Sequence, residues 1–489
     1  MKRQEARSRA SDRETTLLRQ QDNGFSEPTI QASGRVYLKD GAGYPLLPDE
    51  QLAGSVRDSL YDLIPLGPRE LKLINTPAFL RLQQVKQLGF VYRIWPGATH
   101  TRYEHSLGCY HLMVRALRAL LMRGSDGGLD GVATDSVQAL IVAALLHDVG
   151  HYPFSHTIED LGFLIAHHEH VGREIIEHSE IATILERDYH LSPSRVADII
   201  DPPVDRALSP DDRLLNRLLS GALDVDKLDY LPRDARGCNV PYGGVDVARL
   251  LSALRIHGDV DGQRGLVITH KGISPVHSLL HARQEMFDNI YWHHTSRSLQ
   301  AMLVRAVYDA LSAGAITAKQ LTGLTDASLL TLLAQARMPA SSRALSADLD
   351  LRRPYKVVLE ISLPAGRLFQ GLDELGRNAE RRRTIEQTLA TELAAALETE
   401  IADYEVLFDI PRPEKWEMDV RVSFAHPPVG MKPLMTWEEA TGLRSEDLMN
   451  YEQHQRRIRV VVAERLRPLL RARRDDVLVP LLSKLIAAG

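Results

Sequence analysis

The sequence has few cysteines, few aromatic residues and no long apolar run, and each shortage excludes a class of protein. The 489 residues include only two cysteines, Cys109 and Cys238, which excludes a disulfide framework and fits a reducing compartment. The longest apolar run, residues 139–146, is much too short to cross a bilayer. The basic N-terminus is not followed by the apolar stretch of a secretory signal. We therefore expect a cytoplasmic protein without a membrane partner.

The charge and the aromatic content argue against a general nucleic-acid-binding surface. The formal net charge is −5, so an anionic substrate must be met by a local cluster of Arg and Lys rather than by a basic surface field. Aromatic residues make up 6% of the chain and leave few platforms for base stacking. The 19 histidines beside two cysteines favour nitrogen and oxygen ligands for any metal ion.

Sequence patterns predict a tail followed by two lobes. Residues 1–34 are polar, charged and unpatterned, as in a disordered tail. Residues 35–312 are dominated by helical periodicity from residue 68 onward, which predicts a mainly α-helical domain with small β-hairpins. The expected hairpins cover 36–47 and 254–268, and the expected helices include 103–122, 136–148 and 276–311.

Beyond residue 312 the pattern changes to short apolar strands between helices. This predicts a smaller mixed α/β C-terminal lobe over 313–489, with a regulatory or oligomerisation role. The expected strands are 357–363, 404–410 and 420–424, and the expected helices are 385–404 and the Arg-rich 449–488.

The pair His147-Asp148 ends a helix that is apolar nearly all round and is therefore expected to be buried. An ionised Asp in that place is costly unless something positive compensates it, which a divalent metal does well. Taken alone, such a pair is more often a helix cap or a surface ion pair. The neighbouring sequence favours a metal site, because polar groups also gather at residues 100–108 (HTRYEHSLG), 147–156 (HDVGHYPFSH) and 224–230 (DVDKLDY).

These motifs, in this order, resemble the H…HD…D signature of the HD superfamily of phosphohydrolases. The surrounding sequence, for example Lys86-Gln-Leu-Gly89 and Pro96-Gly-Ala-Thr-His100, is similar to that of the dNTP triphosphohydrolase branch. This branch includes the SAM-and-HD-domain enzymes and their bacterial relatives. The resemblance covers roughly residues 60–310, and the chain has no room for a SAM domain ahead of it. It implies an HD-domain helical core.

In that family two His and two Asp ligate one divalent metal, here His105, His147, Asp148 and Asp226. The resemblance leaves the metal open among Mn, Mg, Fe, Co, Ni and Zn. It implies hydrolysis of a dNTP to a deoxynucleoside and inorganic triphosphate, in a homo-oligomer that is a dimer or a tetramer. The preferred base and the biological role, dNTP pool control or phage defence, stay open.

The resemblance also implies the residues that contact the substrate. Positions that contact phosphate in the family are Arg102, Lys227, Tyr230 and Arg283, and positions at the sugar are Gln87, Leu88, Asp234 and Tyr291. Arg and Lys suit phosphate oxygens, and an apolar wall beside C2′ rejects a ribose hydroxyl.

A proton-transfer and support cluster is implied at His151, His156, His168 and Glu169. His156 is the expected general acid toward the leaving 5′ oxygen, because an imidazole titrates near neutrality. Glu169 is the expected partner that fixes the tautomer of its neighbour His168.

Two alternatives remain. HD domains also act as nucleotide phosphatases and phosphodiesterases, which the metal motif alone does not separate from the triphosphohydrolase. A non-enzymatic alternative is a nucleotide-sensing protein, or one that binds single-stranded nucleic acid weakly through its Arg-rich stretches 377–383 and 456–474. A solvated helix face with acidic neighbours such as Glu380, Glu464 and Asp475 is the favoured explanation of those stretches.

Some family members are activated by a guanine nucleotide at a subunit interface, where an Asp reads the guanine edge beside an Arg and a Gln. The corresponding positions here are Asn75, Gln83 and Leu80, so the Asp and the Arg are missing. We therefore predict that this nucleotide activation is changed or absent. The measurement is the rate of the purified, metal-loaded protein with GTP alone as effector, and a strong, saturable rise in that rate would contradict the prediction.

Overall fold

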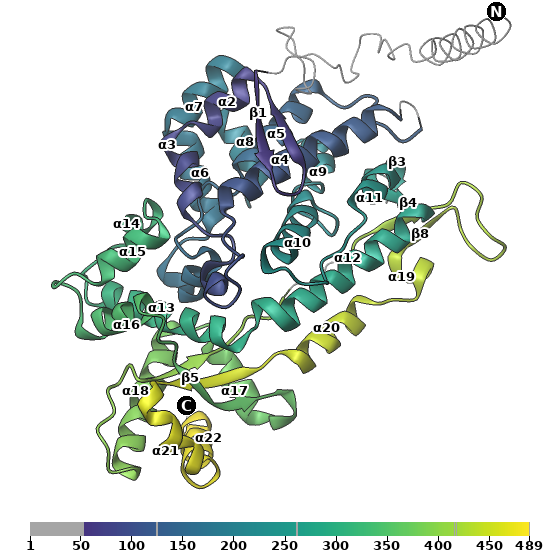
Figure 1. Ribbon diagram of the computed structural model, residues 1–489. Coiled ribbons are helices and arrows are strands. Elements are labelled where there is room, and N and C mark those ends of the chain that lie inside the picture. The colour runs from purple at the N-terminus through teal and green to yellow at the C-terminus, as the bar shows by residue number, and fades with distance from the viewer. Residues whose placement is uncertain (1–52, 124–125, 261–262, 415, 417, 489) are drawn as a thin grey trace, which may run out of the picture.

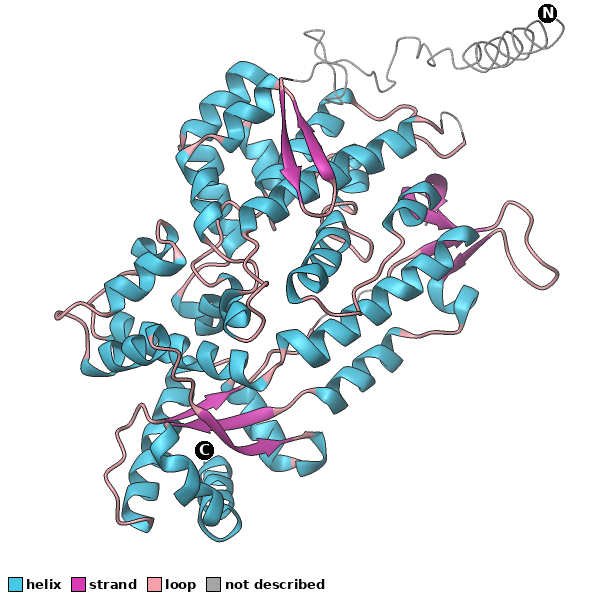
Figure 2. Ribbon diagram, in the orientation of Figure 1, coloured by secondary structure: helices cyan, strands magenta, loops and turns pink. Residues whose placement is uncertain are grey.

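The computed structural model describes residues 53–123, 126–260, 263–414, 416 and 418–488. The predicted tail 1–34 and the predicted hairpin 36–47 lie outside these residues. The described chain is mainly helical, with small sheets of two, four and three strands (Figures 1 and 2). Within it, no helix combines the length and the apolar character needed to cross a membrane.

The N-terminal part is the predicted helical core. It begins with the antiparallel hairpin of β1 (Gly54–Asp58) and β2 (Asp62–Leu66), which the sequence patterns did not reveal. The helices that follow are α2 (Pro68–Ile74), α3 (Pro77–Leu80), α4 (Arg102–Leu121), α5 (Thr134–Leu146), α6 (His168–His178), α7 (Glu180–Ile184), α8 (Pro193–Ile200), α9 (Pro210–Asn216), α10 (Val225–Cys238), α11 (Val247–Ala253), α12 (Ile273–Met286) and α13 (His294–Ser312).

Helix α5 lies at the centre of this core. From Ser136 onward all of its side chains are buried, which explains why its sequence is apolar all round, and it packs against α4, α8 and α9. Helix α4 starts with a capping box in which Glu104 accepts a hydrogen bond from the backbone N of Thr101 at 2.6 Å. Helix α10 packs against α4 and α12, so the ends of α4, α5 and α10 meet.

The C-terminal part is the mixed α/β region that the sequence predicts. Its helices are α14 (Ala318–Thr322), α15 (Asp326–Leu333), α16 (Ala340–Asp350), α17 (Arg367–Leu375), α18 (Ala379–Ala396), α19 (Trp437–Thr441), α20 (Ser445–Gln455), α21 (Arg467–Ala472) and α22 (Val479–Ala488). Strands β5 (Lys356–Ile361), β9 (Ile458–Val462) and β6 (Val406–Asp409) form an antiparallel sheet in that order.

The second sheet joins the two parts of the chain. The predicted hairpin forms as β3 (Leu254–Val260) and β4 (Gln263–Thr269). Strand β7 (Arg421–Ser423) returns from the C-terminal part to pair with β4 in parallel, and β8 (Leu434–Thr436) pairs with β7. Helix α13 ends at residue 312, the predicted boundary between the two lobes. That boundary stays a prediction, because β7 and β8 come after residue 312 but lie on the N-terminal part.

Three helix predictions need correction. Residues 449–488 are not one helix, because they contain β9, the central strand of its sheet. The sequence Ile458-Arg-Val-Val-Val462 is rich in β-branched residues, which favour strands. The helix expected over 385–404 runs instead from Ala379 to Ala396, and the stretch 276–311 is broken by a π-helical turn at Phe287–Tyr291.

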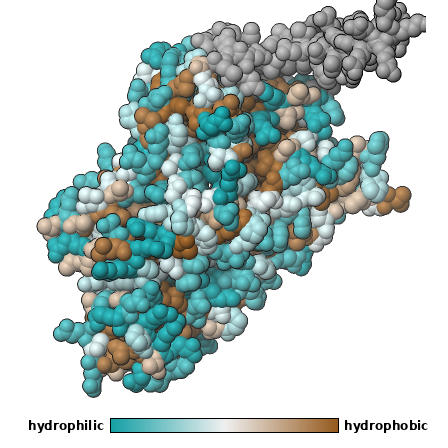
Figure 3. All heavy atoms as spheres, in the orientation of Figure 1, coloured by the Kyte–Doolittle hydropathy of each residue, from teal (hydrophilic) through white to brown (hydrophobic). Residues whose placement is uncertain are grey.

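Three clusters of buried apolar side chains stabilise the fold. The first fills the N-terminal helices, and the third lies against the three-stranded sheet. The second joins loop residues Phe90 and Phe154 to α13, α15 and α16, and these two rings stack with centroids 4.3 Å apart. The face seen in Figure 3 is mostly hydrophilic, with apolar side chains in smaller groups.

Gly150, two residues after Asp148, lets α6 approach the end of α5. A Cβ atom on Gly150 would lie 2.1 Å from the carbonyl oxygen of His168 and 2.3 Å from the backbone N of Gly172. We predict that Gly150→Ala destabilises the protein by about 3 kcal/mol, because backbone rather than a flexible side chain must move.

The measurement is the midpoint of thermal unfolding. Gly244→Ala is the matched control, since a Cβ atom there meets nothing within 4 Å. Equal midpoints for the two variants would show that α6 does not pack as tightly as described.

Candidate metal centre and active site

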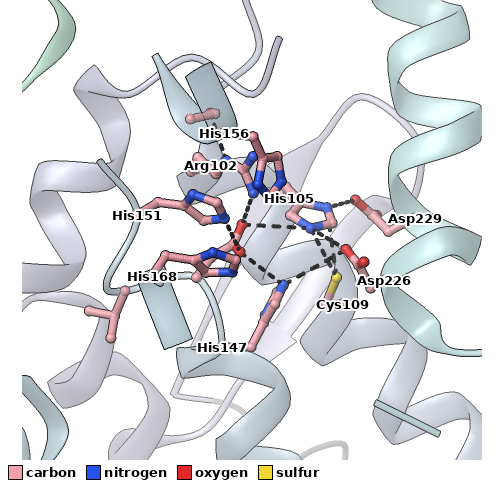
Figure 4. A network of polar contacts seen from close by, with 12 residues as sticks. Arg102, His105, Cys109, His147, His151, His156, His168, Asp226 and Asp229 are labelled. Carbon is pink, nitrogen blue, oxygen red and sulfur yellow. Dashed lines mark hydrogen bonds and ion pairs between the residues drawn. The ribbon is translucent and has the colours of Figure 1, made fainter. Parts of the chain in front are cut away.

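Three helices bring the four predicted metal ligands together (Figure 4). His105 lies in the first turns of α4, His147 and Asp148 follow α5, and Asp226 lies in the first turn of α10. The Nε2 atom of His105 is 2.9 Å from Oδ1 of Asp226 and 3.7 Å from Oδ2 of Asp148. The Nε2 atom of His147 is 3.4 Å from Asp148 and 3.9 Å from Asp226.

Hydrogen bonds on the far side of each imidazole set its tautomer. The Nδ1 atom of His105 donates to Oδ2 of Asp229 at 2.8 Å, and Nδ1 of His147 donates to the carbonyl of Ala144 at 2.9 Å. Both Nε2 atoms therefore face the carboxylates, an orientation common in metal sites. Nε2 of His147 is buried without a hydrogen-bond partner among the described residues, so this donor set fits a divalent cation.

The two carboxylates of the centre are held ionised. Burial opposes ionisation of Asp148, but Arg102, His147 and His151 outweigh it and hold the pKa of Asp148 well below its ordinary value. Arg102 donates to Oδ2 of Asp148 at 2.7 Å. Burial also opposes ionisation of Asp226, but the hydrogen bond with His105 and the charge of both histidines lower its pKa. Deprotonated carboxylates are the form that binds metal.

Cys109 also lies at this centre, one helical turn after His105. Its Sγ atom is 3.6 Å from Nε2 of His105 and lies near the carbonyl of Val225. The thiol is fully buried, and burial raises its pKa, so it stays protonated at neutral pH. Cys109 nevertheless belongs, with His105, His147 and Asp226, to a group of side chains whose ligand atoms lie close enough together to hold a metal ion, whereas the predicted ligand set takes Asp148 in place of the thiol.

A second group of histidines lies beside the centre and shares one carboxylate. The carboxyl of Glu159 accepts hydrogen bonds from Nδ1 of His156 at 2.8 Å and from Nδ1 of His168 at 2.7 Å. The sequence analysis assigned the orienting role to Glu169, whose carboxylate is farther from the same nitrogen, at 3.4 Å. Glu159 was missed, although its spacing of three residues from His156 on a helical turn was the available signal.

The protonation states of this group differ. Burial, then the charges of Arg102 and His168, lower the pKa of His151 well below its ordinary value. Burial also opposes the charging of His168, but Glu159 outweighs it and raises the pKa of that imidazole. The two rings stack with centroids 3.7 Å apart, a neutral ring against a charged one. The His156 side chain is 65% exposed and can meet a substrate atom.

A cavity of about 510 Å³ opens beside Asp226. Its lining includes the predicted acid His156 and all eight predicted substrate contacts, which are Gln87, Leu88, Arg102, Lys227, Tyr230, Asp234, Arg283 and Tyr291. His168 and Glu169 line a neighbouring cavity of about 470 Å³. His156, Glu159, Lys227 and Arg283 line both cavities.

One end of the first cavity carries a fixed carboxylate. Oδ2 of Asp234 accepts a hydrogen bond from the hydroxyl of Tyr291 at 2.7 Å, and Oδ1 accepts one from Nε2 of His100 at 2.7 Å. The carboxyl group is buried and held on both oxygens. It can therefore accept a hydrogen bond from a ligand hydroxyl at a defined place.

Six of the twelve arginines in the two Arg-rich stretches form ion pairs with acids of the described residues. Their partners include Asp309 and Asp403 for Arg383, Glu405 for Arg465, Asp475 for Arg474, and Asp409 and Glu360 for Arg459. Such pairing favours a solvated, ion-paired face over a phosphate-binding one. Nucleic-acid binding stays a prediction.

Family models match two adjacent parts of the chain. The HD domain matches residues 102–231, and the HD associated region matches residues 245–437. The first match starts at α4 and ends within α10, so it contains all four residues of the metal centre. The chain belongs to the HD superfamily of phosphohydrolases.

Several known proteins are similar to this chain. An uncharacterised protein of Methanocaldococcus jannaschii is 31% identical over 307 residues, which is 63% of this chain and 60% of that protein. An uncharacterised protein of Bacillus subtilis is 32% identical, over 49% of this chain and 51% of that one. The deoxynucleoside triphosphate triphosphohydrolase SAMHD1 of Homo sapiens is 27% identical, over 52% of this chain and 44% of that protein. The chain thus spans between two fifths and three fifths of these relatives.

Solved structures share the fold over most of the chain. A hypothetical protein from Aquifex aeolicus matches with a TM-score of 0.64 at 26% identity, covering 86% of this chain and 99% of its own. A phosphohydrolase from Bacteroides thetaiotaomicron matches with a TM-score of 0.62 at 23% identity, covering 84% of this chain and 100% of its own. Both matches extend well beyond the HD domain, so the C-terminal part belongs to the shared fold.

We predict that removing a carboxylate of the centre lowers its metal content and that replacing the thiol does not. Asp148→Ala should lose most of the bound metal, because it removes a ligand and leaves Arg102 without its partner, whereas Cys109→Ser should keep it. Metal content after dialysis, measured by mass spectrometry on the folded proteins, checks both variants. Equal loss in the two would identify the sulfur as a ligand, and full retention in Asp148→Ala would remove that residue from the centre.

Proposed function

We propose that this chain is a metal-dependent dNTP triphosphohydrolase, which converts a dNTP and water to a deoxynucleoside and inorganic triphosphate. The observation that carries the proposal is one cavity lined both by Asp226 of the metal centre and by the cations Arg102, Lys227 and Arg283. A triphosphate carries several negative charges, and three cations in one cavity suit that load. The named activity of the human relative supports the same reaction class.

The metal centre and His156 divide the proposed chemistry between them. His105, His147, Asp148 and Asp226 would hold a divalent cation, which would supply Lewis-acid stabilisation of phosphate and a nucleophilic water at neutral pH. The water oxygen bonds to the α-phosphorus, and the bond from that phosphorus to the 5′ oxygen breaks. His156, oriented by Glu159, gives its proton to the 5′ oxygen as the deoxynucleoside leaves.

The sugar end of the cavity supports selection of a deoxyribose. Asp234 is held by Tyr291 and His100, so its carboxylate is placed to accept a hydrogen bond from the 3′-hydroxyl. Leu88 and the ring of Tyr291 line the same cavity and give it an apolar wall. A ribose 2′-hydroxyl against such a wall loses its hydrogen bonds with water without replacement.

The partner predictions depend on the same proposal. The substrate is a dNTP, and the assembly is a homo-oligomer, either a dimer or a tetramer. An activating nucleotide at a subunit interface also stays a prediction. The choice among Mn, Mg, Fe, Co, Ni and Zn is a question for metal content and reconstitution.

Product analysis tests the proposed function directly. The purified protein is incubated with each dNTP and Mn²⁺ or Mg²⁺, singly and in mixtures, and the products are resolved by ion-exchange chromatography. We predict a deoxynucleoside together with intact triphosphate, and at least tenfold slower turnover of the matching ribonucleotide. Orthophosphate or a nucleoside monophosphate as product would assign a different HD chemistry, and no turnover with any metal would contradict an enzyme.

A further inference from the structure

A short segment of the C-terminal part, residues 411–414, runs along the catalytic cavity between β6 and β7. Its side chains Arg412, Pro413 and Glu414 line that cavity. Arg456 donates to the carbonyl of Pro411 at 3.0 Å, and Arg412 donates to the carbonyl of Glu159 at 2.6 Å. The segment is therefore held both by the C-terminal part and by the histidine group.

Glu414 places a carboxylate on one of the cations assigned to phosphate. Its Oε2 atom accepts a hydrogen bond from Nη2 of Arg283 at 3.0 Å. The guanidinium of Arg283 also lies over the ring of Trp416, 4.5 Å from its centroid. The carboxylate thus occupies a direction from which a phosphate oxygen can approach Arg283.

Each of the three cations has an acidic partner, but the partners differ in how firmly they are fixed. Asp148, on Arg102, belongs to the metal centre. Asp224, on Lys227, also caps α10 by accepting from the backbone N of Lys227 at 2.8 Å. Both carboxylates therefore have further functions and cannot leave without disturbing the site.

The carboxylate of Glu414 is fixed less firmly than the other two. Arg283 is its hydrogen-bond partner in the part of the chain that the structure describes. Its side chain is 33% exposed, so it can turn into water. Apart from that ion pair, Glu414 is anchored through its backbone, whose N–H donates to Glu452 of α20 at 2.8 Å.

We infer that the carboxylate of Glu414 competes with the substrate for Arg283. It occupies the place where a phosphate group far from the scissile bond binds, and the substrate must displace it. The identity of that substrate anion rests on the proposed function. The competition itself is a property of Arg283 and Glu414. A ligand with too few phosphates to reach Arg283 leaves this ion pair intact and gains nothing from it. Glu414 thereby weakens binding of the long anion alone.

The test measures binding of inorganic tripolyphosphate to the full-length, Mn²⁺-loaded protein by calorimetry. Glu414→Gln keeps the size of the side chain and removes its charge, so tripolyphosphate affinity should rise roughly five-fold, the upper end for a partly exposed ion pair. The matched control is Glu446→Gln, which removes a carboxylate from the Arg444–Glu446 pair outside the cavity and should leave the affinity unchanged. Arg283→Gln should weaken binding.

The outcomes separate this inference from the proposed function. Unchanged or weaker tripolyphosphate binding in Glu414→Gln overturns the inference, since it would show that Glu414 only positions Arg283. An equal rise in Glu446→Gln overturns it too, because general charge would then explain the effect. Tighter binding in Glu414→Gln beside a wild-type protein that releases no triphosphate from dNTPs supports the competitor and refutes the proposed reaction.

Discussion

The metal centre depends on a buried ion cluster around Asp229. This carboxylate accepts a hydrogen bond from His105 at 2.8 Å, from Arg233 at 2.8 and 2.9 Å, and from the hydroxyl of Tyr61 at 2.8 Å. Arg233 also donates to Asp58 at 2.8 Å, so one guanidinium balances two carboxylates. Because Asp58, Asp229 and Arg233 are buried, removing one of them would leave an uncompensated charge in the interior, a loss of several kcal/mol.

This cluster explains why the β1–β2 hairpin and α10 belong to the site although neither contributes most of its ligands. The hairpin brings Asp58 and, just after it, Tyr61. Helix α10 carries Asp226 for the metal and Asp229 for the imidazole behind it, three residues apart on one face. Gly108 on α4 allows the approach, since a Cβ atom there would lie 1.9 Å from Oδ1 of Asp229. The geometry of His105 is therefore set from three directions.

The sequence was informative where chemistry and local pattern coincide. Residues 139–146 predicted a buried helix, which the structure confirms. The His147-Asp148 pair at its end indicated a metal site only together with the neighbouring motifs, and the family resemblance then implied the full ligand set. The roles of Glu159 and Glu414 could not be predicted from the sequence in this way. Their roles depend on partners that the fold brings close, Arg283 being 131 residues from Glu414 along the chain.

Strand β9 shows a case in which the sequence pattern was misleading, because it predicted a helix for this segment. Arg459 in this strand, with Arg456 and Arg457 just before it, suggested an exposed helix. In the fold two of them are buried, Arg456 paired with Asp373 and Arg459 with Asp409. Buried, paired arginines in a strand have the same sequence signature as solvated arginines on a helix, and periodicity distinguishes them poorly over a few residues. Only the acids from distant segments decide between the two.

The loop after the His-Asp pair shows how far the active site extends beyond the HD motif. Phe154 and Ser155 both have φ near +56°, a left-handed conformation that is costly for residues with side chains and persists when neighbours hold it. Asp326 of α15 stabilises this conformation. Its carboxylate accepts hydrogen bonds from the backbone N of Phe154 at 2.7 Å and from the backbone N of Lys86 at 3.0 Å.

The strained turn directly precedes His156, and Ser155 binds Arg102 at 3.0 Å. The placement of the expected acid and of Arg102, which is proposed to bind phosphate, therefore relies on a carboxylate beyond residue 312. Arg412, which reaches Glu159, makes a second such link. A fragment ending at α13 would keep every metal ligand and still lose the contacts that shape the substrate cavity, so the region after the HD domain is part of the catalytic structure.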